Sequence, residues 1–148
     1  MKRKDTQYYK DQQLIVTTLS GELDAADVQE WHESLKAVTG SLEAGTQFKI
    51  LVDLHGFKAN NFEVHKQFRV MVPQLLAEYG WYVGYIRMFP EAEICIRSTN
   101  NIRCRAAAHV HHDETKIANY ASNYSMINEG FFTDSRAARE WVEAIVLH

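Results

Sequence analysis

The length, composition and charge of the chain exclude several classes of protein. At 148 residues it has the size of one domain, and a chain this long can bury a core of its own. A hydrophobic content of 46% is typical of a globular protein rather than a disordered one. The formal net charge of −3 gives no general attraction to nucleic acid, and no apolar run is long enough to cross a membrane. We therefore expect one domain over residues 1–148, with no nucleic-acid partner and no membrane span.

The start of the chain and its two cysteines suggest where the protein works. The basic residues 2–4 are not followed by an apolar segment, so we expect no secretory signal and a cytoplasmic location. Cys95 and Cys104 are then expected to be reduced thiols. If residues 93–97 and 102–109 formed a hairpin, the two cysteines would face each other, and a disulfide is the alternative.

The first third of the chain alternates strand and helix patterns. Two β-rich runs at residues 7–10 and 14–19 flank a turn and predict an N-terminal hairpin. Apolar residues then recur every three or four positions over residues 25–38, which predicts a helix with one buried face. Residues 48–54 are almost continuously apolar, as in a central strand that is covered on both faces.

A second helix is predicted from Asn60, with Glu63 three residues later as its capping partner. Pro73 lies inside this helical pattern and should kink or divide the helix, because proline lacks the backbone donor. Residues 80–103 follow neither pattern, and we treat them as an atypical segment.

The pattern becomes clear again near the C-terminus. Residues 106–110 predict a strand and residues 114–124 a helix, followed by a short strand at residues 130–132. Asp134 is a suitable N-cap for a closing helix. Alternating strands and helices predict an α/β fold with a mixed, mostly parallel sheet, an N-terminal hairpin and helices covering the sheet.

Two further motifs stand out in the chain. The first is Leu-Ser-Gly-Glu-Leu-Asp at residues 19–24, between a strand and a helix. The second lies at residues 131–142, where an aromatic strand and an acidic cap precede a helix that ends in Ala-x-x-Trp-Val. Both resemble motifs of the STAS domain, which is named for sulfate transporters and anti-sigma-factor antagonists. The resemblance implies a STAS-like, CRAL-TRIO-like single-domain fold and a non-enzymatic binding or regulatory module.

The phosphorylation switch of anti-sigma-factor antagonists has no counterpart here. In those proteins a Ser or Thr at the start of the second helix accepts phosphate, whereas residues 60–64 of this chain are Asn-Asn-Phe-Glu-Val. Glu63 is interpreted either as a cap or as a permanent mimic of the phosphate. The resemblance implies a binding surface on the second helix and the loop before it, formed by His55, Lys58, Asn60, Asn61 and Glu63.

Histidines gather at the ends of two predicted strands. His55 follows one strand, and His109 and His111 end another. Because parallel strands end at the same edge of a sheet, the three imidazoles could converge there and bind zinc or a similar metal. The alternative is that they are polar side chains at the rim of the sheet.

Aromatic residues are dense in the atypical segment, where Trp81 and Tyr85 are the candidates of interest. Such a cluster could line a pocket for an apolar ligand, form a homodimer contact, or complete the core. The chain has neither a nucleophile elbow nor a glycine-rich phosphate loop, so we expect no enzyme activity and no cofactor. The favoured hypothesis is a binding module for a protein partner or a small apolar ligand. The alternatives are a metal-binding protein or enzyme that uses the histidines, and an obligate homo-oligomer with a structural role.

Overall fold

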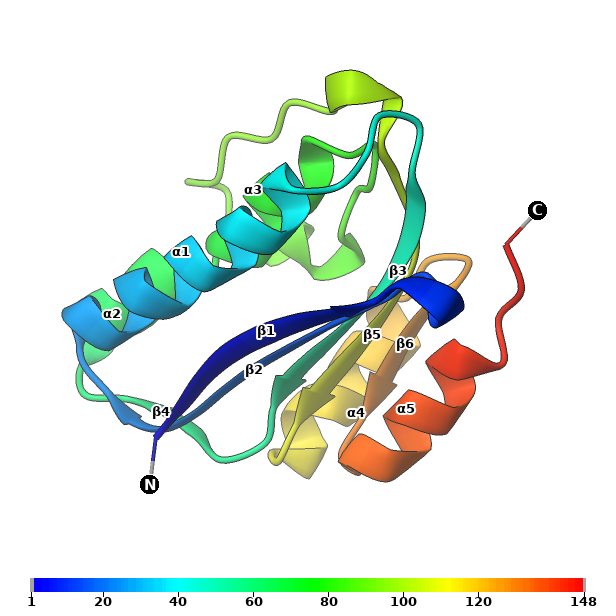
Figure 1. Cartoon of the computed structure of the whole chain (residues 1–148). Coiled ribbons are helices and arrows are strands. Elements are labelled where there is room, and N and C mark those ends of the chain that lie inside the picture. Colours follow the sequence, from blue (N-terminus) through cyan, green and yellow to red (C-terminus); the bar gives the residue numbers. More distant parts are fainter. Residues whose placement is uncertain (1, 148) are drawn as a thin grey trace.

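The structure, a computed structural model, describes residues 2–147 and is built around a mixed, mostly parallel sheet (Figure 1). The strands in that range are β1 (Arg3–Tyr9), β2 (Leu14–Leu23), β3 (Gln47–Leu54), β4 (Phe57–Ala59), β5 (Arg103–His111) and β6 (Glu129–Phe132). Five of them lie in the order β1-β2-β3-β5-β6, and the short β4 pairs with the end of β2. Only the β1–β2 pairing is antiparallel, since a single tight turn joins these two strands. The predicted fold class is therefore confirmed.

Helices cover both faces of the sheet. The helices are α1 (Ala25–Gly40), α2 (Phe62–Phe68), α3 (Met71–Ala77), α4 (Glu114–Asn123) and α5 (Ser135–Glu143). The larger core lies between the sheet and α1, α2 and α3, while α5 packs a smaller core on the opposite face, visible in red in Figure 1. None of the helices in residues 2–147 combines the length and apolar character that a membrane crossing requires.

Helix α1 is anchored at its start and on its buried face. Asp24 and Asp27 form a reciprocal capping box, and the ammonium of Lys2 pairs with the Asp27 carboxylate at 2.7 Å. Trp31 is fully buried, and its indole N–H donates to the Thr17 hydroxyl at 2.7 Å. These contacts fix α1 across β1 and β2.

The second helical segment begins one residue later than expected. Asn61, not Asn60, is the N-cap, and its side chain accepts a hydrogen bond from the Val64 N–H at 3.0 Å. Glu63 is then the second helical residue, so it does not occupy the capping-box position that we predicted for it. The helical region is divided, as one of the two predicted outcomes had it, but the break lies before Pro73: α2 ends at Phe68, and Pro73 is the third residue of α3, where its missing donor costs little.

The atypical segment, residues 80–103, forms no hairpin, so the alternative in which Cys95 and Cys104 face each other does not hold. Cys95 is exposed and Cys104 is buried, and both are free thiols. The reason is that β5 already pairs with β3, while the Cys104 N–H donates to the carbonyl of Tyr79 at 2.9 Å. The segment instead includes a 3-10 turn at Gly84–Met88 and returns past the end of α3.

Candidate binding pocket

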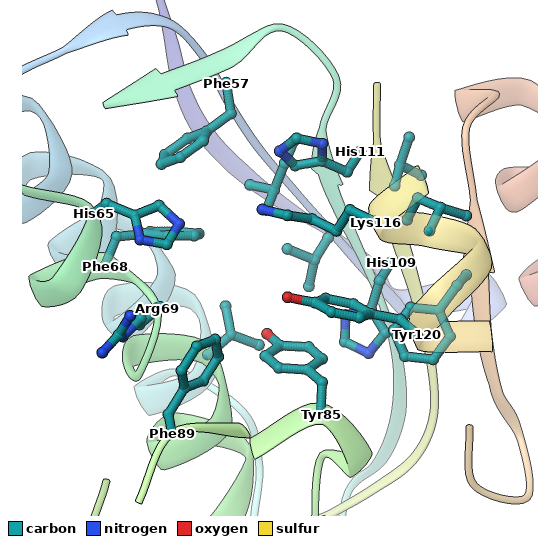
Figure 2. A pocket seen from close by; sticks show the side chains of 16 residues that line it. Phe57, His65, Phe68, Arg69, Tyr85, Phe89, His109, His111, Lys116 and Tyr120 are labelled. Atoms are coloured by element: carbon teal, nitrogen blue, oxygen red, sulfur yellow. The ribbon is translucent and has the colours of Figure 1, made fainter. Parts of the chain in front are cut away.

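A cavity lies where β3 and β5 end, between the sheet, α2 and α4 (Figure 2). The space open to the centre of a water-sized sphere is about 60 Å³. The carboxyl ends of parallel strands are the usual ligand sites of open α/β sheets, because the helices that follow neighbouring strands leave a crevice there. The residues that line it are Val52, Leu54, Phe57, His65, Phe68, Arg69, Val72, Tyr85, Phe89, His109, Val110, His111, Lys116, Ile117, Tyr120 and Phe131.

The walls of the cavity are mostly apolar and aromatic. The rings of Phe57 and Phe68 lie 4.6 Å apart, centroid to centroid, where the short β4 folds back toward α2. Val72 of α3 and Ile117 of α4 are buried and add aliphatic surface. A lining of this kind, with a few polar groups, is typical of small-molecule sites.

Two tyrosines form the floor on the side of the atypical segment. The rings of Tyr85 and Tyr120 stack at 5.1 Å with an interplanar angle of 17°. Figure 2 shows both hydroxyl groups directed into the cavity. Burial raises the pKa of both phenols above the ordinary value, so they stay protonated at neutral pH and can donate hydrogen bonds.

Basic side chains surround the mouth. Burial lowers the pKa of the Lys116 ammonium, and it also lowers the pKa of the His65 imidazole. Arg69 is already engaged, because its guanidinium pairs with the Glu91 carboxylate and lies 4.4 Å from the centre of the Phe89 ring. In Figure 2 the Lys116 side chain extends toward the cavity.

The buried hydrogen-bond partner of His109, Glu129, holds the atypical segment against the sheet. His109 Nε2 lies 3.0 Å from Glu129 Oε2, and the Glu129 side chain is fully buried. The other oxygen of Glu129 accepts a hydrogen bond from the Gly84 N–H at 3.2 Å. This link between β5, β6 and the 3-10 turn positions Tyr85, the next residue, beside the cavity.

The structure brings together some of the predicted site residues and separates others. Tyr85, His109 and His111 line the cavity. Lys58 and Asn61 instead border an open groove next to its mouth, which shares His65, His111 and Lys116 with the cavity.

The remaining predicted residues lie elsewhere. His55 is exposed in the turn after β3, and Asn60 and Glu63 are exposed outside the cavity lining. Trp81 packs against the larger core rather than the cavity, and its buried indole N–H has no hydrogen-bond partner among the described residues.

The three histidines predicted as metal ligands do not converge. His109 is paired with Glu129, while the His55 ring lies 5.9 Å from the ring of His112 rather than beside His109. Within residues 2–147, no three His, Cys, Asp or Glu side chains are placed so that they could hold a metal ion together.

Several lining residues were not predicted as site residues, although their spacing held a signal. His65, Phe68, Arg69 and Val72 follow each other at intervals of one, three or four along the second helical region, so they share one face. Lys116 and Tyr120 are likewise four residues apart, directly after the histidine-rich end of β5. This spacing places both groups of residues on helix faces close to the ends of central strands, where ligand sites usually form.

The fold and the cavity together define an α/β protein with a mixed sheet and a largely apolar pocket at the carboxyl ends of its central strands. Comparisons of the chain with protein-family models, with curated proteins and with solved structures gave no match. The STAS-like resemblance therefore stays a prediction.

The pocket histidines should make stability depend on pH. Burial, with the nearby Lys116 and His112 charges, lowers the pKa of His111 from 6.5 to about 4. Between these two values the unfolded chain binds a proton that the folded protein does not, so the free energy of unfolding should decrease as the pH falls through this window. Urea unfolding followed by circular dichroism at several pH values measures the slope.

His111→Gln removes one titrating group and should reduce that slope. A residual slope is expected, because burial also lowers the pKa of His65. His55→Gln, at an exposed position in the turn after β3, is the matched control and should leave the slope as in the wild type. An unchanged slope in His111→Gln would contradict the prediction.

Proposed function

We propose that this domain is a non-enzymatic binding module that takes up a small, largely apolar molecule in the cavity between β3, β5, α2 and α4. The observation that carries the proposal is the cavity itself. Aromatic and aliphatic side chains form most of its wall, and a few polar groups converge on it, as in small-molecule sites. The STAS-like motifs at residues 19–24 and 131–142 support a regulatory role in the cytoplasm.

The kinds of side chain around the cavity indicate a ligand site rather than a packing defect in the core. Away from the cavity, the larger core is made of apolar side chains, and Trp31, Phe48 and Leu76 are fully buried there. Around the cavity, in contrast, phenol, imidazole and ammonium groups border the apolar walls. Polar groups that converge on an apolar space can orient a bound molecule.

A neutral fluorescent dye tests the proposal directly. N-phenyl-1-naphthylamine should bind to the 148-residue protein with an increase in fluorescence. Leu54→Trp places a large side chain at the lining position at the end of β3, and it should weaken dye binding by about tenfold, which corresponds to about 1.4 kcal/mol. Fluorescence titration gives the dissociation constant, and circular dichroism establishes that the variant is folded.

The control variant introduces a tryptophan outside the cavity lining. Ile96 is 50% exposed and lies outside the cavity lining, so Ile96→Trp should bind the dye as the wild type does. If the wild type does not bind the dye, or if a folded Leu54→Trp protein binds it unchanged, the cavity is not a site for apolar molecules.

A further inference from the structure

We propose that the molecule bound in this cavity carries a single acidic group, such as a carboxylate, which is held by Lys116 with help from the hydroxyls of Tyr85 and Tyr120. This inference rests on the proposed function and adds the chemical class of the ligand.

The lining of the cavity is basic, although the protein as a whole is acidic. Arg69, Lys116 and three histidines contribute to the lining, and none of its residues is an aspartate or a glutamate. The chain as a whole has a net charge of −3. A lining without carboxylates does not repel an anion, and a cation within low-dielectric walls attracts one.

Lys116 is the cation available to a ligand. Among residues 2–147, the ion pairs of the structure include Arg69 with Glu91 but none that involves Lys116. Burial disfavours the Lys116 ammonium, as the lowered pKa shows, and the Asp113 carboxylate opposes this only at a distance. An incoming anion would supply the charge partner that a partly buried ammonium lacks.

The two tyrosine hydroxyls and the single unpaired ammonium favour a singly charged group on the ligand. Tyr85 and Tyr120 direct their hydroxyls into the same space that Lys116 faces (Figure 2), and a carboxylate accepts hydrogen bonds from such donors. Arg69 is already neutralised by Glu91, so only one unpaired ammonium faces the ligand. One cation with two neutral donors matches a carboxylate better than a doubly charged phosphate monoester.

A matched pair of ligands tests the inference. 2-Naphthoate and 2-naphthalenemethanol share the same ring system, and they differ in the charge of the head group. Displacement of N-phenyl-1-naphthylamine from the wild type should show that naphthoate binds about tenfold more tightly than the alcohol. 2-Naphthyl phosphate should bind more weakly than naphthoate.

Variants assign the preference to Lys116. Lys116→Met keeps an unbranched side chain and should remove the preference for naphthoate while leaving the affinity for the alcohol within about twofold. Lys66→Met makes the same change of charge at an exposed position of α2 outside the lining, and it should keep the preference. Tyr120→Phe keeps the aromatic ring and should reduce the preference in part.

The outcomes separate this inference from the proposed function. Equal binding of the acid and the alcohol by the wild type, a preference that persists in Lys116→Met, or tighter binding of the phosphate would each overturn the single-acid inference, while the cavity would remain a site for apolar molecules. Failure of the dye and of all three naphthalene compounds to bind would overturn both.

Discussion

Gly84→Ala is expected to lower the free energy of unfolding by about 3 kcal/mol, at the upper end of the usual cost of overpacking. A Cβ atom at this position would lie 1.6 Å from the carbonyl oxygen of Tyr124, and that oxygen belongs to the backbone after α4. Neither partner can move aside alone, because the Gly84 N–H is bonded to the buried Glu129 carboxylate. The 3-10 turn must therefore shift away from the sheet, and Tyr85 must shift with it.

The same variant should also weaken binding in the cavity. Because Tyr85 lines the cavity, displacement of the turn should lower the affinity for N-phenyl-1-naphthylamine. Urea unfolding and dye titration measure the two effects. Gly40→Ala is the control: its new Cβ would have nothing within 4 Å at the end of α1, so alanine should leave stability unchanged or raise it slightly. If Gly84→Ala is as stable as Gly40→Ala, the close packing of the turn against Tyr124 is incorrect.

Trp31→Ala is expected to cost about 3–5 kcal/mol, the usual range when a large buried aromatic side chain is deleted. Trp31 is fully buried, and its ring lies 5.5 Å from the ring of Phe68, so the deletion would leave a cavity between α1 and α2. The Thr17 hydroxyl would lose one hydrogen bond, but it would keep its partner Thr6 at 2.8 Å. The expected loss is therefore mainly one of packing.

Chemical denaturation with intermediate variants can separate these contributions. Trp31→Phe keeps most of the packing and removes the N–H, and it should cost less than Trp31→Ala. Gln29→Ala, on the exposed face of the same helix, should change the free energy of unfolding by no more than about 0.5 kcal/mol. A Trp31→Ala protein that loses less than this surface control would contradict the placement of α1 on the sheet.

The strands of the sheet differ in how well local sequence patterns predict them. The apolar runs of β2, β3 and β5 are visible in the sequence because these central strands are buried, and their residues must be apolar. β1 starts at Arg3, earlier than expected, because its first residues are polar and are held by pairing with β2. β4 was not predicted at all, since three residues are too short to show a period.

The candidate site was predicted only in part for a similar reason. Tyr85, His109 and His111 were singled out by their residue types and their positions at strand ends or in an aromatic cluster, and they do line the cavity. Lys116 was not singled out, although it lies four residues before Tyr120 and shortly after the end of β5. Its significance comes from facing two tyrosines, one of which lies in a segment without secondary-structure periodicity.

The amino-acid sequence by itself determined the class of fold, the order of its main elements and the division of the second helical region, because periodic burial and the geometry of proline act over a few neighbouring residues. Only the tertiary structure decided that Cys95 and Cys104 are apart, that Glu129 holds His109 and Gly84, and that a basic, largely apolar cavity forms beside β3 and β5. These features depend on contacts between residues that are far apart in the chain, such as 20 positions for His109 and Glu129 and 45 for Gly84 and Glu129, and such contacts leave no periodic trace in the local sequence.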